Sequence, residues 1–224
     1  MAEKSGAPTG KAGPPATTSM KRKRGRGADP ESTRQALVDA AISSLIEVGY
    51  AGTTARSIAS RADCNQAAIY YHFGGIEPLL IAALKASSAR RLERYKNQIV
   101  DATDLMSLVG ELERLYAEDR ESGHLGLLAE LVGGITASPE LRQGIEESTE
   151  PWLVFVESRI REAASTVPFG PSLPTGDIAD LIFSLVIGVE LRSKIDENDE
   201  RPARLFRLAR LAATLATAGA EAGE

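Results

Sequence analysis

Thr53–Phe73 reads TTARSIASRADCNQAAIYYHF, and its pattern decides the fold. Thr53 or Thr54 can cap a first short helix, because a threonine oxygen accepts from the free N–H groups of a first helical turn. The run Asp63–Asn65 then interrupts the helical pattern, and Asp and Asn both tolerate the left-handed backbone of a tight turn. A second short helix is expected at 66–73. The stretch therefore predicts two helices joined by a tight turn.

The second helix has one apolar side that can anchor it and an opposite side made of small and aromatic residues. Ile69 and Phe73 are four residues apart and share one face, while Ala67 and Tyr71 point the other way. A helix-turn-helix needs this arrangement, because the major groove of DNA admits one helix whose N-terminal residues reach base edges. The alternative is an ordinary helical hairpin inside a core.

A dozen positions across 32–84 agree in type and spacing with a known pattern. They are Gly49-Tyr50, Thr53-Thr54, Ile58-Ala59, Ala68-Ile69-Tyr70, His72-Phe73 and Leu79. In these residues the chain resembles the N-terminal domain of the TetR family of bacterial transcriptional regulators. The resemblance implies an all-helical DNA-binding domain, a larger helical ligand-binding domain and a homodimer.

Three positions depart from the family pattern. Asp63 stands where the family usually has Gly, and Cys64 where it usually has Val. Both are substitutions that a turn tolerates. Ile76 stands where the family usually has a lysine that grips a phosphate, so a contact with the DNA backbone is missing there.

The composition of the 224 residues favours an all-α protein, because helix formers dominate and aromatic residues are few. The single cysteine excludes an internal disulfide, and no apolar run approaches the roughly 20 residues of a membrane helix. The N-terminus lacks the apolar segment of a signal peptide. No phosphate loop, nucleophile elbow or metal-ligand cluster is present. We expect a cytoplasmic protein that is not an enzyme and has no cofactor, metal site or membrane partner.

Charge is distributed unevenly along the chain. Residues 1–100 hold 15 Lys and Arg against 8 Asp and Glu, and residues 101–224 hold 11 against 23, so the balances are +7 and −12. Such a chain suits a protein that meets phosphate with one end only. A non-specific architectural DNA-binding protein, the alternative, would be basic throughout.

Four segments are expected. Residues 1–28 form a disordered basic arm, 29–75 the helix-turn-helix domain, 76–218 the helical ligand-binding and dimerisation domain, and 219–224 a disordered tail. The arm can neutralise phosphates or enter a minor groove, although it could instead be a solvated charge run. Its candidate DNA contacts are Lys21, Arg22, Lys23, Arg24 and Arg26.

The first helix is expected to start at Asp29 and Pro30 and to end at Gly49. Its apolar stripe is Leu37, Ala41, Leu45 and Val48. Further helices are expected at 77–100, 105–121, 125–131, 139–164, 177–195 and 199–218. The last but one is apolar over most of its surface, so it must be buried on several sides. The resemblance implies that the last two helices pair with those of a second chain. The alternative is that they close the monomer core.

By position, the resemblance assigns DNA contacts to two groups of residues. Arg56 matches a residue that reaches a base or its phosphate, and Gln66, Ala67 and Ala68 match the base-facing start of the recognition helix. Tyr70, Tyr71 and His72 match the part that meets the DNA backbone, supported by Thr54 and Ser57. Arg suits guanine, Gln can pair with adenine, and alanine methyl groups can touch thymine. Arg56 could equally be a free surface residue, and Tyr70 a half-buried core residue.

The effector site is less visible in the sequence. The resemblance places it inside the body, where the candidates are Tyr116, His124, Leu128, Trp152 and Phe155. Each of these could instead be plain core. Together the expectations describe a homodimeric repressor on a palindromic double-stranded DNA operator, released by a small-molecule effector.

Overall fold

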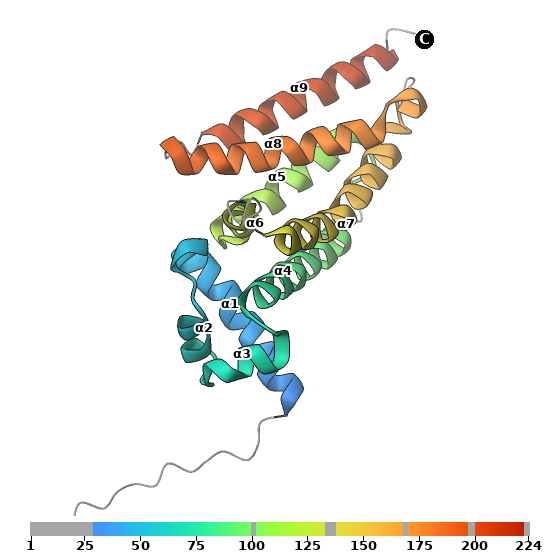
Figure 1. Ribbon diagram of the computed structural model, residues 1–224. Coiled ribbons are helices and arrows are strands. Elements are labelled where there is room, and N and C mark those ends of the chain that lie inside the picture. Colours follow the sequence, from blue (N-terminus) through green and yellow to red (C-terminus); the bar gives the residue numbers. More distant parts are fainter. Residues whose placement is uncertain (1–28, 100–101, 133–137, 168–169, 197–199, 222–224) are drawn as a thin grey trace, which may run out of the picture.

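The computed structural model describes residues 29–99, 102–132, 138–167, 170–196 and 200–221. Throughout these ranges the regular structure is helical, so the predicted all-α class is confirmed. Figure 1 shows a small cluster of α1, α2 and α3 at one end and α8 with α9 at the other. The predicted basic arm at 1–28 lies outside the described residues.

The N-terminal unit consists of α1 (Pro30–Gly52), α2 (Ala55–Arg61) and α3 (Gln66–Phe73). Leu37, Ala41 and Leu45 of α1 are buried, as their spacing predicts, but Val48 is 54% exposed and does not belong to that stripe. Gly49 has a left-handed φ of 69° and kinks α1 there, and helical residues follow up to Gly52. The predicted helix end at Gly49 is therefore a kink inside the helix.

The rest of the described chain forms the body. It contains α4 (Ile76–Gln98), α5 (Leu105–Glu121), α6 (His124–Val132), α7 (Pro139–Ala164), the 3-10 turn η1 (Gly170–Ser172), α8 (Thr175–Asp196) and α9 (Arg201–Glu221). α9 includes the first three residues of the tail predicted at 219–224, and residues 222–224 lie outside the described ranges.

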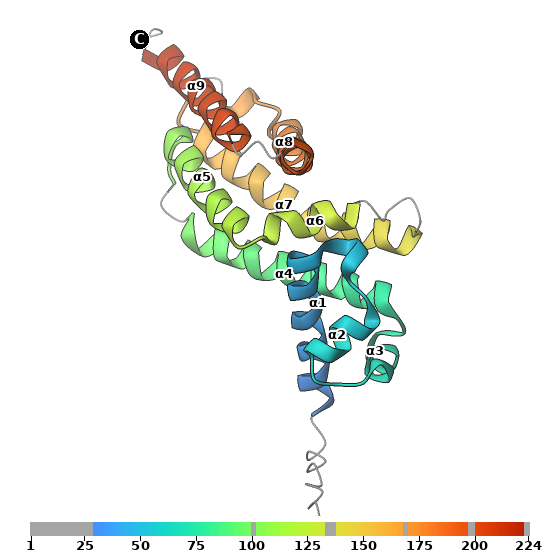
Figure 2. The same ribbon diagram turned by 90° about the vertical axis from the view of Figure 1, so that its left-hand side faces the viewer.

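Two apolar cores hold the molecule together, and α4 contributes to both. The first joins α1, α2, α3 and the start of α4 to Leu127, Leu131 and Leu141 of the body. The second is built from the end of α4 with α5, α7 and α8. Two views at right angles show α4 running from the N-terminal unit into the body (Figures 1 and 2). α4 and α6 therefore tie the N-terminal unit to the body.

Two further observations concern membrane-spanning helices and metal-binding clusters. Over the described residues, no single helix combines the length and apolar composition needed to cross a membrane, although α3 and α4 pass that test as a pair bent by 72°. In the same part of the chain, no group of three His, Cys, Asp or Glu side chains is placed to hold a metal ion.

Candidate nucleic-acid interface and effector cavity

Reciprocal hydrogen bonds fix the start of α2. The Thr54 hydroxyl accepts from the Ser57 backbone N–H at 3.1 Å, and the Ser57 hydroxyl accepts from the Thr54 N–H at 3.0 Å. This capping box satisfies two of the N–H groups that a helix start leaves free. Thr53 is instead buried, and its hydroxyl donates to the Gly49 carbonyl at 2.7 Å. Of the two predicted candidates, Thr54 is the cap.

The turn between α2 and α3 depends on Asp63 and Asn65. Asp63 has φ of 50°, the one positive φ at a non-glycine position in the described residues. A short polar side chain is among the few that adopt this conformation. The Asn65 side chain then accepts from the Ala68 N–H at 3.1 Å and caps α3. Half-burial of Cys64, with help from the Asp63 charge, raises the pKa of its thiol.

The recognition helix α3 is anchored on one side and open on the other. Ile69 is fully buried, and Phe73 packs against the same core. On the open side, Tyr70 is 60% and Tyr71 81% exposed. Gln66 and Ala67 are exposed too, whereas Ala68 and His72 are half-buried. Large aromatic side chains at this exposure are available to a partner.

The charges around α3 are few. Arg56 at the start of α2 is exposed and has no carboxylate partner within the described ranges. Arg61 is paired with Glu47, and the Arg34 guanidinium lies over the Phe73 ring at 5.1 Å. Residues 29–75 hold three arginines against five carboxylates, so the positive balance of the N-terminal half comes from the arm and from α4.

Ile76 begins α4, and its side chain is half-buried against the N-terminal core. The position at which the family usually has a lysine therefore serves packing in this chain. It places no positive charge beside the recognition helix.

Residues 37–83, which carry this whole arrangement, match the family model described as bacterial regulatory proteins, tetR family. The helix-turn-helix domain of this chain belongs to the TetR family. The match covers most of α1, the helix-turn-helix and the start of α4. The family is one of DNA-binding transcriptional regulators and not of enzymes.

Relatives beyond the matched domain agree with this assignment. The TetR-family chain is 22% identical over 161 residues to the HTH-type transcriptional regulator UidR of Escherichia coli, covering 72% of this chain and 81% of UidR. It is 27% identical over 146 residues to an uncharacterized HTH-type transcriptional regulator of Mycobacterium bovis, covering 64% and 72% of the two chains.

Solved structures share the fold of this TetR-family chain. The fatty acid degradation regulator FadR from Bacillus halodurans superposes with a TM-score of 0.65 at 21% identity, over 83% of this chain and 95% of FadR. The regulatory protein TetR from Rhodobacter sphaeroides gives 0.66 at 18% identity, over 80% and 97%. A helix-turn-helix domain followed by a helical body is thus the fold of this protein.

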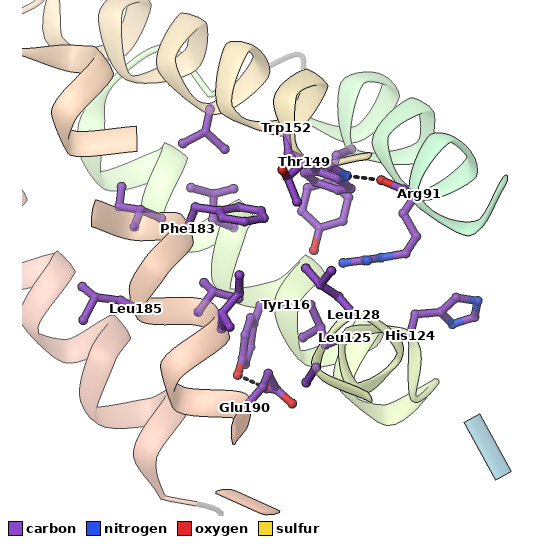
Figure 3. Close-up of a pocket in the computed structure, with 18 of the residues that line it drawn as sticks. Arg91, Tyr116, His124, Leu125, Leu128, Thr149, Trp152, Phe183, Leu185 and Glu190 are labelled. Atoms are coloured by element: carbon purple, nitrogen blue, oxygen red, sulfur yellow. Dashed lines mark hydrogen bonds between the residues drawn. The ribbon is translucent and has the colours of Figure 1, made fainter. Parts of the chain in front are cut away.

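The body of the TetR-family chain encloses a cavity between α4, α5, α6, α7, α8 and α9 (Figure 3). Its volume is about 200 Å³. Most of its wall is apolar, including Leu112, Leu128, Val156, Phe183 and Val186. Such a mostly apolar pocket with a few polar groups is typical of a small-molecule site.

Two polar clusters stand at separate places in this wall. In one, the Arg91 Nε donates to the Asp119 carboxylate at 2.7 Å, and the Arg91 guanidinium lies over the Trp152 ring at 5.1 Å. In the other, the Tyr116 hydroxyl donates to the buried Glu190 carboxylate. Burial, and then that carboxylate, raise the pKa of Tyr116 well above its ordinary value. Figure 3 shows the two clusters on different sides of Leu128.

The structure brings four of the five predicted effector residues to the cavity. Tyr116, His124, Leu128 and Trp152 line it. The His124 ring points away from the other labelled side chains in Figure 3. Phe155 does not line the cavity: it is 8% exposed and packs in the second core, beside the Trp152 ring.

The sequence alone missed the polar cavity residues of α4 and α8, chiefly Ser87, Arg91 and Glu190. Arg91 lies in a cationic run in which Arg90 and Lys96 face solvent, so charge did not mark it. Its spacing of four from Ser87, and of seven from Leu84, was the available signal.

Proposed function

We propose that this protein is a repressor that binds a palindromic operator as a homodimer and leaves it when a small molecule occupies the body cavity. One observation carries this proposal: α3 is capped and anchored on its inner side while Tyr70 and Tyr71 stand in solvent on its outer side. A helix held this way fits a major groove, where its first residues meet base edges. The protein would act in the cytoplasm.

In this proposal the residues of α2 and α3 fall into two groups. Gln66, Ala67, Ala68 and Arg56 read bases, because they lie at the starts of α3 and α2. Tyr70, Tyr71 and His72, with Thr54 and Ser57, meet the phosphate backbone and set the register. Because residues 29–75 are net acidic, the arm would supply much of the charge that attracts DNA. The helix-turn-helix would span 29–75, and the effector and dimer domain 76–218.

Dimerisation is supported by an apolar stripe on the last two helices. Leu181 and Leu185 of α8 and Leu208, Leu211 and Leu215 of α9 are each at least 40% exposed in the single chain. Their spacing of three or four places them together on each helix. A contiguous exposed patch of this kind marks an interaction site, and a palindrome needs two recognition helices about 34 Å apart.

The test is fluorescence anisotropy of the full chain on the DNA upstream of its own coding region, against scrambled DNA, at two salt concentrations. We expect tight, salt-dependent binding to a palindrome with two chains per site. Equal binding to both DNAs would point to a non-specific architectural protein. Absence of binding to either DNA, with the protein folded, would count against the recognition role of α3 on this promoter.

Two variants sharpen the same test. Deleting residues 1–27 should weaken binding and flatten its salt dependence, because up to five cations near the domain are lost. Leu208→Glu should give monomers in sedimentation and lose operator binding, whereas Arg207→Gln on the same helix should stay dimeric. A dimer that survives Leu208→Glu would contradict the α8–α9 interface.

A further inference from the structure

The cavity is charged asymmetrically. At one side, Asp119 accepts from both Arg91 and Arg94, so one carboxylate faces two guanidinium groups. Glu118 lies 3.9 Å from Arg94, but its side chain is 42% exposed and also pairs with Arg114. Asp119 with Arg91 and Arg94 therefore carries one positive charge in excess, which Glu118 offsets from the Arg94 side, and Arg91 is the member that lines the cavity.

The other polar cluster is already balanced. The Glu190 carboxylate accepts from the Tyr116 hydroxyl and lies 3.8 Å from Arg120. One negative charge thus meets one positive charge and one hydrogen-bond donor. A buried carboxylate that is satisfied in this way has little attraction left for a cationic ligand.

Arg91 still has donors to offer. Its Nε donates to Asp119, and the face of its guanidinium packs on the Trp152 ring. Its terminal nitrogens make no hydrogen bond to the described residues. The side chain is 17% exposed, and it reaches from α4 towards Leu128 in Figure 3. The two terminal N–H groups of a guanidinium form a fork that matches the two oxygens of a carboxylate.

A second free donor stands one helical turn away. Ser87 precedes Arg91 by four residues on α4, lines the same cavity and is 3% exposed. Its hydroxyl has no hydrogen-bond partner among the residues that the structure describes. A buried hydroxyl without a partner is costly, and a ligand oxygen would remove that cost.

We propose that the cavity binds an organic carboxylate with an apolar body, its carboxylate held by Arg91 and Ser87. The apolar body would lie against Leu128, Phe183 and Val186, away from α4. This inference rests on the proposed function for its regulatory meaning, since the effector would be such a molecule. Binding itself is measured without DNA, so the two proposals can fail separately.

The experiment uses three ligands of equal chain length that differ in head group: decanoate, neutral decanamide and cationic decylammonium. Each is titrated into the full-length protein below its aggregation concentration. The readout is the fluorescence of Trp152, the single tryptophan of the chain, with calorimetry as a second measurement. We expect decanoate to bind about tenfold more tightly than decanamide, because charge-assisted fork contacts are about twice as strong as neutral ones. Decylammonium should bind most weakly.

Variants assign the selectivity to a residue. Arg91→Gln should bring the dissociation constants of decanoate and decanamide to within about threefold, because the charge and the fork are lost. Arg91→Lys keeps the charge without the fork and should give an intermediate ratio. Lys96→Gln, an exposed cation on the same helix, should keep the wild-type ratio.

Several results would overturn the inference. They are equal binding of decanoate and decanamide, tightest binding of decylammonium, no binding of any of the three, or an unchanged ratio in Arg91→Gln. If Arg91→Gln does not fold, the head-group series on the unaltered protein still decides whether the cavity prefers a carboxylate. If decanoate changes the Trp152 fluorescence but leaves the DNA complex intact, the carboxylate site is upheld and the proposed ligand release is contradicted.

Discussion

The exposed face of α3 and the cavity of the body use tyrosine in opposite ways. Tyr70 and Tyr71 of α3 are exposed to solvent, whereas the exposed fraction of Tyr95 and of Tyr116 in the body is at most 6%. In the body, burial raises the pKa of both phenols well above the ordinary value of a tyrosine. The same side chain is thus a free contact group in one region and a structural hydrogen-bonding group in the other.

Arginine shows the same contrast. Arg56 is exposed without a carboxylate partner among the described residues, while Arg91 is held by buried Asp119. A surface that meets DNA can leave its charges open, because the phosphates arrive with the partner. An interior must compensate its charges in advance. Substitutions on α2 and α3 should therefore alter binding more than stability, and substitutions in the body should do the reverse.

The largest effect is expected for Asp119→Ala. Asp119 is 1% exposed, and its loss leaves Arg91 and Arg94 without their shared carboxylate. Breaking a buried pair from one side costs about 3–5 kcal/mol. Urea unfolding followed by circular dichroism measures the loss. The neighbouring Glu118→Ala serves as control, because an exposed ion pair contributes about 0–1 kcal/mol. Equal losses in the two variants would remove the contrast between interior and surface charges.

Arg56→Ala should have the opposite profile. We expect a loss of about 1–3 kcal/mol in operator binding, concentrated on one base pair, because an arginine fork pairs with guanine. The free energy of unfolding should change by less than about 0.5 kcal/mol, as is usual for a surface substitution. Anisotropy on operators with single base changes measures the first quantity. A uniform loss on every base variant would assign Arg56 to the phosphate backbone, and exposed Ser60→Ala on the same helix is the control.

The sequence predicted the N-terminal unit better than the cavity because the signals of the former are local. Asn65, Thr54 and the turn at Asp63 act over three or four residues, so residue type and spacing predicted two helices and a turn there, with Thr53 as the alternative cap. The cavity joins residues far apart along the chain, such as Tyr116 and Glu190. No periodicity connects such positions. For the same reason Phe155 was indistinguishable from Trp152 in the sequence, although they differ in whether they reach the cavity.

Asn65→Ala tests whether the recognition helix depends on its local cap. Its side chain accepts from the Ala68 N–H at 3.1 Å, and an N-cap replaced by alanine costs about 1 kcal/mol. We expect that loss in urea unfolding together with weaker operator binding, since a frayed first turn displaces Gln66 and Ala67. Asn65→Asp, which keeps an accepting oxygen, should retain the stability. Full operator affinity in Asn65→Ala would show that packing of Ile69 alone sets the helix.

The smallest effect concerns His124, beside the cavity. Burial, and then the nearby Arg91, lower the pKa of its imidazole, and Asp119 opposes this in part. A folded-state pKa below the unfolded value of about 6.5 means that protonation favours the unfolded chain. This contribution is present above pH 6.5 and is lost as the pH falls through the folded pKa.

His124→Gln should remove that pH dependence. Between pH 7.5 and 5.0 the variant should lose less unfolding free energy than the unaltered protein, because it has no imidazole to protonate. Urea titrations at several pH values measure the difference, and nuclear magnetic resonance of the imidazole protons should give a midpoint below about 6.5. A higher midpoint would mean that Asp119 outweighs Arg91 at this position. The cavity side of α6 would then carry negative potential, which is the reverse of what binding a carboxylate requires.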